Sequence, residues 1–334
     1  MRSSSRVKVL FCLFAAVAFG YSSLSSSFQL SCTYDDNPFL LSPGDRSAFL
    51  HSVNPERFPY STLDDLDVML AGGLSWSYSE QGNIDLKLRA HQFLANWEKS
   101  YSVSTLTLEY GTALFGDLGL SWTWLPSYLI RYYRNPGSGT DYIPCRFAEH
   151  LTTLELKKRL GPMEFTPFYR FELDDYIADF NHYDTKAHRP GIATKWRPVP
   201  NLRIDAGYEF KLAQAQGPVP DLSYHQHQLD AAILSWPSKL RRLGFRAGFG
   251  FEQRTYTTRN SPEIDPEHVD RQDRTERISL ELRYRLRQIV LAADYSLEWR
   301  EVKSPYRPQI EEVKDYRQNR IGLSITLNSG RWRK

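Results

Sequence analysis

Acidic and basic residues recur at every second position in several long segments of the chain, with apolar residues between them. In the segment 202–212 the even positions hold only Leu, Ile, Ala, Tyr and Phe, whereas the odd positions hold Arg, Asp, Gly, Glu and Lys. On a β-strand these two sets point to opposite faces. The charged set can line a hydrated passage, or it can form a lattice of cross-strand ion pairs. The pattern recurs in segments 164–174, 245–252, 278–287 and 289–300.

The charged face of these segments supplies the candidate lumen-lining residues. Acids and bases are balanced on it, so no strong preference for one sign of ion is expected. The candidates are Arg170, Glu172, Arg203, Asp205, Glu209, Lys211, Arg246, Glu252, Glu281, Arg283, Arg285, Asp294, Glu298 and Arg300.

No other group of residues forms a recognisable catalytic or cofactor-binding motif. His225 and His227 fall on one side of a predicted strand, a spacing that can bind a metal, but no third ligand is identifiable. The sequence contains no glycine-rich phosphate loop, zinc-binding spacing or nucleophile elbow. We therefore expect no catalytic residue, no metal, no cofactor and no enzymatic activity. A net charge of only +3, without a basic cluster in a nucleic-acid motif, argues against nucleic acid as a partner.

The alternating segments are too long for an ordinary β-sandwich. They run for roughly 10–14 residues, whereas strands of soluble sheets are usually about 5–6 residues long and a tilted membrane-crossing strand needs about 9–11. No segment after the N-terminus is apolar for long enough to form a membrane-spanning helix. A mean hydropathy of −0.50 suits a transmembrane barrel, because every second strand residue faces a polar interior.

The connections between these segments set the strand count. Short turns alternate with longer polar loops that follow Phe39, Ala95, Asn135, Ile177, Gln214, Arg259 and Val302. This arrangement predicts an all-β fold: a single transmembrane antiparallel β-barrel of about 14 strands, with 12 or 16 as alternatives. The expected strands are 27–37, 65–79, 83–95, 100–113, 117–133, 146–159, 163–176, 188–197, 201–214, 224–236, 242–257, 275–287, 289–302 and 317–329.

The N-terminal segment predicts secretion. Basic residues precede an uncharged apolar run, 9–20, and Ala18 and Gly20 supply the small residues of a cleavage site before Tyr21. Residues 1–20 are therefore predicted to be a signal peptide, and 21–334 the barrel domain. In an oxidising compartment Cys32 and Cys145 could pair or stay free.

Aromatic residues on the apolar face are candidates for anchoring at the lipid headgroups. They are Trp76, Trp122, Trp124, Trp196, Tyr208, Tyr284, Tyr295 and Trp299. A sugar-stacking platform is the alternative interpretation.

Two sequence motifs resemble those of known barrels. The segment 34–39, Tyr-Asp-Asp-Asn-Pro-Phe, resembles the first-strand motif of a poorly characterised porin-like family of bacterial outer-membrane barrels, and segments 182–191 and 222–229 resemble its loop-to-strand junctions. The last strand resembles the signal read by the barrel-assembly machinery, with Arg320 followed by Gly322, Ile325 and Leu327. It departs from that signal in having aliphatic residues for aromatic ones and an extension to Lys334.

These resemblances imply a location in the cell outer membrane of a Gram-negative bacterium. The implied partners are outer-membrane lipid, the barrel-assembly machinery and components of an export system. The expected function is a narrow or gated channel, or an export or transport component, with the loop 258–274 able to fold in and restrict it. Two alternatives stay open: a structural or surface-interaction barrel without transport, and a membrane-embedded hydrolase.

Overall fold

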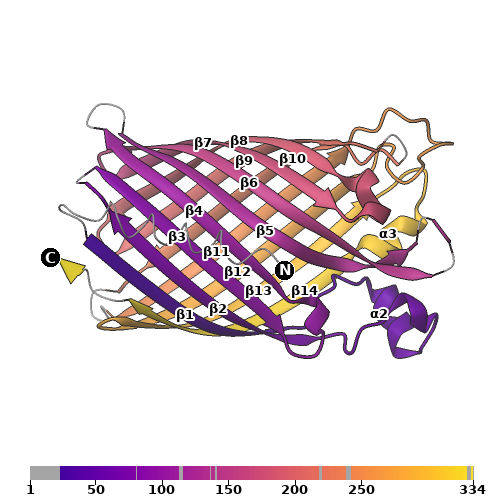
Figure 1. Cartoon of the computed structure of the whole chain (residues 1–334), viewed down its shortest axis with the longest axis horizontal. Helices are drawn as coiled ribbons and strands as arrows, with labels where there is room; N and C mark the ends of the chain where they lie inside the picture. Colours follow the sequence, from indigo (N-terminus) through magenta and orange to yellow (C-terminus); the bar gives the residue numbers. More distant parts are fainter. Residues whose placement is uncertain are drawn as a thin grey trace, which may run out of the picture.

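The chain forms a closed antiparallel β-barrel of fourteen long strands (Figure 1). The computed structural model describes residues 23–79, 81–112, 116–135, 137–139, 141–217, 220–237, 242–328 and 332–333. The predicted signal peptide lies outside these residues. The predicted fold class and strand count are confirmed. No helix in the described ranges is long and apolar enough to cross a membrane.

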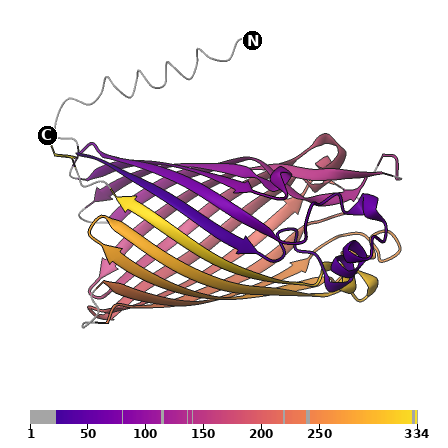
Figure 2. The same cartoon turned by 90° about the horizontal axis from the view of Figure 1, so that it is seen from below.

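Each long strand pairs with its neighbours along the chain, and β14 pairs with β1 to close the barrel (Figure 2). The strands are β1 (Ser23–Asp35), β2 (Asp65–Ser77), β3 (Gly82–Phe93), β4 (Tyr101–Thr112), β5 (Gly116–Arg134), β6 (Tyr142–Leu160), β7 (Met163–Tyr176), β8 (Thr185–Val199), β9 (Leu202–Ala215), β10 (Tyr224–Ser235), β11 (Leu243–Tyr256), β12 (Gln272–Leu286), β13 (Ile289–Lys303) and β14 (Tyr316–Asn328). A two-residue strand, β15 (Trp332–Arg333), adds to the start of β1.

Two strands differ clearly from their predicted bounds. β1 begins before residue 27, because its serine-rich start pairs with the end of β2 although it lacks apolar alternation. β6 begins before residue 146, because the β5–β6 hairpin continues past a bulge on β5, between Leu129, which pairs with Arg146, and Arg131, which pairs with Cys145.

The two ends of the barrel differ. At the turn end the connections are short, such as 161–162, where Gly161 adopts a φ of +59° that favours glycine. At the loop end, on the right in Figure 1, lie the longer connections and all the helices that the described residues form. These are α2 (Pro43–Leu50), α3 (Gln309–Lys314) and the 3-10 helices η1 (Pro55–Arg57), η2 (Trp97–Lys99) and η3 (Ala178–Tyr183).

The pairing register keeps the two faces of the sheet distinct all the way round. Across β9, β10 and β11 the inward row Glu209–Gln228–Glu252 alternates with an outward row of Tyr208, Leu229 and Phe251. The outward face is covered with exposed apolar side chains, among them Leu70, Leu88, Leu120, Ile192, Ile233, Phe249, Leu280 and Leu323. An apolar belt around a closed barrel is the surface that a bilayer requires.

The segment that carries the porin-like resemblance joins the first and last strands. The Asp36 carboxylate accepts hydrogen bonds from the backbone N–H and the side-chain amide of Asn319, both at 2.7 Å. The fully buried Asn37 donates from Nδ2 to the Arg317 carbonyl at 3.0 Å and to the Leu41 carbonyl at 2.9 Å. These bonds close the β1–β14 seam at the loop end.

The connection between β1 and β2 packs as a small core rather than standing free. Phe39 stacks on Tyr60 with ring centroids 3.7 Å apart, and Phe58 and Leu129 are buried beside them. This core fixes α2 against the loop end of β5.

Candidate functional site

The inward face of the barrel is the candidate site. All the predicted lumen-lining residues occupy inward rows of the register: Arg170, Glu172, Arg203, Asp205, Glu209, Lys211, Arg246, Glu252, Glu281, Arg283, Arg285, Asp294, Glu298 and Arg300. Their environments differ sharply along the barrel axis.

The loop-end half of the lumen contains a buried ion-pair network. Glu172 is 3% exposed and accepts a hydrogen bond from Lys211 Nζ at 2.6 Å. Glu209 is 4% exposed and accepts one from Arg170 Nη1 at 2.6 Å. Arg189 bridges the two carboxylates, contacting Glu172 and donating from Nε to Glu209 at 2.7 Å. Charges this well paired hold side chains of neighbouring strands together across the lumen wall.

The turn-end half has a different character. Its inward arginines Arg246, Arg283 and Arg285 are exposed. Arg283 pairs with Glu281, and their side chains are 46% and 19% exposed, so this pair is partly open to water. Between the charged residues stand small ones: Ser27, Gly73, Gly119, Ser121, Gly248, Ala292 and Ser324. Small inward residues leave this half of the barrel open.

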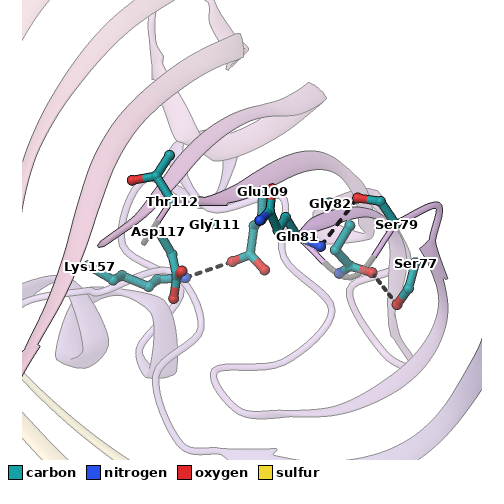
Figure 3. A pocket seen from close by; sticks show the side chains of 10 residues that line it. Ser77, Ser79, Gln81, Gly82, Glu109, Gly111, Thr112, Asp117 and Lys157 are labelled. Carbon is teal, nitrogen blue, oxygen red and sulfur yellow. Dashed lines mark hydrogen bonds and ion pairs between the residues drawn. The ribbon is translucent and has the colours of Figure 1, made fainter. Parts of the chain in front are cut away.

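Figure 3 shows a polar hollow of about 410 Å³ at the turn end, between the β2–β3 and β4–β5 hairpins and β6. Lys157 Nζ donates to Glu109 at 2.6 Å and contacts Glu155 at 2.9 Å. Ser77 donates to the Asn83 side chain at 3.2 Å. These groups bond one another, so we assign the hollow to the open turn-end half rather than to a separate site.

Six inward tyrosines narrow the lumen at the loop end. They are Tyr128, Tyr133, Tyr176, Tyr224, Tyr256 and Tyr316, and they line a cavity of about 290 Å³ that we call the loop-end cavity. Residues of the connections complete it: Lys99 of η2, Glu267, His268 and Arg271 of the β11–β12 loop, and Lys314 of α3. The loop that was predicted to fold in therefore supplies part of this lining.

The β11–β12 loop is anchored by a buried acid. Asp265 accepts a hydrogen bond from the backbone N–H of Asp221 at 3.0 Å, and His268 Nδ1 lies 2.7 Å from its other carboxylate oxygen. Burial lowers the pKa of His268, while Asp265 opposes that shift. The contact fixes the loop to the connection before β10.

Two lysines of the loop end are held without a carboxylate partner among the described residues. Lys99 Nζ donates to the carbonyls of Leu129 and Ile130 at 2.5 and 3.1 Å and lies over the Tyr128 ring at 4.3 Å. Burial lowers the pKa of Lys99 to about 7. Burial likewise lowers the pKa of Lys314 to about 8, and the neighbouring Arg131, Arg271 and Arg300 lower it further.

The interface aromatics all lie on the outward face, as their positions in the register require. Trp76, Trp196 and Tyr284 lie toward the turn end and Trp299 toward the loop end, whereas Trp122, Trp124, Tyr208 and Tyr295 lie nearer the middles of their strands. Only some of these aromatic residues therefore lie near the strand ends, where two rings of aromatic side chains at the lipid headgroups would be. Their role as membrane anchors stays a prediction.

The histidine and cysteine pairs meet no partner that would make a site. His225 and His227 point outward beside Phe210, and His227 Nδ1 lies 2.9 Å from the Tyr208 hydroxyl. Cys32 lies on the outward face, Cys145 is buried on the inward face, and both are free.

The candidate assembly signal lies on β14. Gly322 faces inward against Asp294, whose Oδ1 would be 2.6 Å from an added Cβ, so a larger residue there would displace the Asp294 carboxylate. Ile325 and Leu327 face outward. Recognition by the assembly machinery stays a prediction.

The sequence pattern missed several charged residues that shape the loop end. Arg189 lies an even number of residues before Lys195 on β8, which is a signal that both face inward. The signal is weak, because His188 and Pro190 interrupt the alternation of apolar and charged residues. Lys99 and Lys314 lie in connections, where no periodic pattern marks them. Arg271 also lies in a connection, but it belongs to the loop 258–274 that was predicted to fold in.

One group of acids in the lumen comes close enough to hold a cation. Oxygen atoms of Glu149, Glu172 and Asp174 lie within 4.8 Å of one another. Glu172 is already neutralised by Arg189 and Lys211. The expected absence of metal, cofactor and enzymatic activity remains a prediction.

The comparisons bear on the fold. No family model matches the sequence, and a search of curated proteins finds no similar chain. Among solved structures, the outer-membrane channel DcaP of Acinetobacter baumannii is 9% identical, with a TM-score of 0.50, 92% of this chain covered and 97% of that one. A loop-deletion mutant of OmpT, an outer-membrane protein of Vibrio cholerae, is 8% identical, with a TM-score of 0.49, 93% of this chain covered and 100% of that one. An anion-selective porin from Comamonas acidovorans is 7% identical, with a TM-score of 0.45, 92% of this chain covered and 99% of that one. The chain has the fold of the bacterial outer-membrane porin-like barrels.

Proposed function

We propose that this protein is a narrow outer-membrane channel with weak charge selectivity. The turn end faces the periplasm and the loop end faces the exterior, the usual asymmetry of short turns and long loops. The apolar belt and the porin-like fold support the membrane location. Solutes would pass along the inward face, entering through the loop-end cavity.

The contrast between the two lumen halves carries this proposal. A wide porin would keep its charged residues in water along the whole passage. Here Glu172, Glu209 and Lys211 toward the loop end are buried, whereas Arg246, Arg283 and Arg285 toward the turn end are exposed. Fourteen strands also enclose less space than the sixteen to eighteen of open porins. Because opposite charges pair along the wall, neither sign of ion should dominate the current.

The test is single-channel current in a planar bilayer, with the reversal potential measured in a salt gradient. We expect a small wild-type conductance and a small reversal potential. The double substitution Tyr224→Ala and Tyr256→Ala should raise the conductance severalfold, because both rings face the lumen at the narrow end. Tyr208→Ala removes a lipid-facing ring and should leave the current unchanged.

A large, steady wild-type current with strong preference for one sign of ion would refute the proposal. No current in either the wild type or the double variant would favour a structural or surface-interaction barrel, in which the long loops are the working surface.

Location and processing are tested separately. The protein should fractionate with outer membranes, and N-terminal sequencing of the mature chain should begin at Tyr21, because residues 1–20 have the composition of a signal peptide. Release of the protein with the periplasmic contents after osmotic shock would overturn the membrane location.

A further inference from the structure

Four cations from separate elements converge on one side of the loop-end cavity. Arg131 comes from β5, Arg271 from the β11–β12 loop, Arg300 from β13 and Lys314 from α3. The three arginines each lower the pKa of Lys314, so each of them lies within electrostatic range of this lysine. We call these four residues the basic cluster.

The basic cluster has too little negative charge beside it. Arg271 forms a bidentate pair with Asp273 at 2.8 and 2.9 Å, and Arg300 contacts the same carboxylate. Arg131 reaches Asp45 only at 3.8 Å. Lys314 forms no ion pair with any described residue and lies over the Tyr133 ring at 5.2 Å. Among the described residues, the four cations therefore form ion pairs with only one shared carboxylate and one distant carboxylate, and Asp174 and Glu267 are the other carboxylates that line the cavity.

A hydrogen-bond donor of the cluster also lacks an acceptor. Arg300 Nε is buried and has no partner in the described part of the chain. A buried donor without an acceptor is destabilising, and the side chain of Arg300 lines the cavity. An oxygen of a bound anion would supply both the missing acceptor and the missing negative charge.

The rest of the cavity limits the kind of anion. Its walls hold Tyr133, Tyr256 and Tyr316 together with apolar Ile130 and Leu222, which favour a hydrophobic or aromatic body over a bare inorganic ion. The volume of about 290 Å³ suits a molecule with one small ring. Asp174, which has a buried carboxylate oxygen without a partner, would repel a second negative charge.

We propose that the loop-end cavity binds a small organic monoanion, with its carboxylate at the basic cluster and its apolar part against the tyrosine rings. This inference rests on the channel proposed above and names the class of solute that enters it. A solute held here would lie at the narrow point of the lumen and would then be released into the open turn-end half.

The experiment measures binding of radiolabelled benzoate by equilibrium dialysis against the full mature chain folded in detergent. We expect saturable binding of one benzoate per barrel. Unlabelled benzyl alcohol, which has the ring without the charge, should compete at least about tenfold less well, and so should acetate, which has the charge without the ring.

Two substitutions locate the binding site. Lys314→Gln and Arg300→Gln should each weaken benzoate binding about tenfold, because each removes a charge-assisted contact. Lys87→Gln is the matched control, because Lys87 is an exposed inward lysine outside the cavity, and it should bind like the wild type. Heat-dependent migration on a gel checks that each variant is folded.

Failure of folded wild-type protein to bind benzoate would overturn the inference, and so would equal competition by benzyl alcohol. Equal binding by Lys314→Gln, Arg300→Gln and wild type would place the anion elsewhere and would also overturn it. A barrel that conducts ions but does not bind benzoate refutes only this inference. A barrel that binds benzoate through the basic cluster but carries no current refutes only the channel.

Discussion

The ion-pair network at the loop end gives a quantitative prediction. Glu172→Gln removes a carboxylate that is 3% exposed and that neutralises two cations. Arg189 keeps Glu209 as a partner, but Lys211, 8% exposed, loses the only carboxylate with which it forms an ion pair among the described residues. Breaking a buried pair by removing one partner costs about 3–5 kcal/mol, because the remaining charge is left uncompensated. Since only one of the two cations is stranded here, we expect about 3 kcal/mol.

A second substitution separates this cause from general damage. Lys211→Met in the Glu172→Gln background removes the stranded charge, so it should recover the free energy of unfolding to within about 1 kcal/mol of the wild type. Glu281→Gln is the matched control, because Glu281 pairs with the exposed Arg283 and should contribute less than about 1 kcal/mol.

The assay is urea unfolding of the barrel folded in lipid vesicles, followed by tryptophan fluorescence. The reasoning is refuted if Glu172→Gln costs no more than Glu281→Gln, or if Lys211→Met fails to compensate. Either result would mean that water reaches the loop-end charges as freely as the turn-end charges, and the contrast between the two halves would no longer support a narrow channel.

Three further predictions use the same assay. Arg placed on the outward face at Ile204, Leu282 or Leu297 should lower the free energy of unfolding by about 2–4 kcal/mol, whereas Arg at the inward Gly207 or Ser296 should cost less; equal costs would mean that the lipid face is misassigned. Raising the pH from about 6.5 to about 9 should stabilise the barrel by on the order of 2 kcal/mol through Lys99, because burial lowers its pKa to about 7 and the unfolded chain binds more protons throughout that window; Lys314, whose pKa is lowered to about 8, adds a smaller effect of the same sign. Lys99→Met should remove most of this dependence of stability on pH. An unchanged dependence would contradict the lowered pKa of Lys99. Asn37→Ala should lower the free energy of unfolding by about 2–3 kcal/mol, because the buried Asn37 amide bonds to Leu41 and across the β1–β14 seam to Arg317. Asn201→Ala, at an exposed position, is the control. Equal effects of the two substitutions would mean that the Asn37 bonds do not stabilise the seam.

The faces of the strands could be predicted from sequence because the strand period of two is local. In the segment 202–212 each residue's side follows from its position alone, and the register then carries that side unchanged to β10 and β11. The strand count followed from the same alternation, interrupted by turns.

Depth along the barrel axis could not be predicted, because it depends on contacts between distant segments. Glu172 and Glu281 have the same residue type and the same inward face, yet one is 3% exposed and the other lies in the open half. The difference comes from neighbours on other strands: Arg189 and Lys211 enclose Glu172, whereas small residues surround the turn-end charges. The loop residues Lys99 and Lys314 were missed for a related reason, since only the folded connections bring them to the lumen.

The inward acids and bases therefore balance over the whole lumen, but they do not balance within each part of it. Opposite charges that lie in one buried network, as Glu172 and Lys211 do, cancel locally and present little field to a passing ion. The basic cluster is different, because Arg271 and Arg300 share the single carboxylate of Asp273 while Lys314 has none. A small inorganic ion passes all of these charges in turn, whereas an organic anion that stops in the loop-end cavity also contacts its tyrosine rings. The weak overall selectivity of the channel and a preference for organic anions at the loop-end cavity are thus compatible consequences of the same charge distribution.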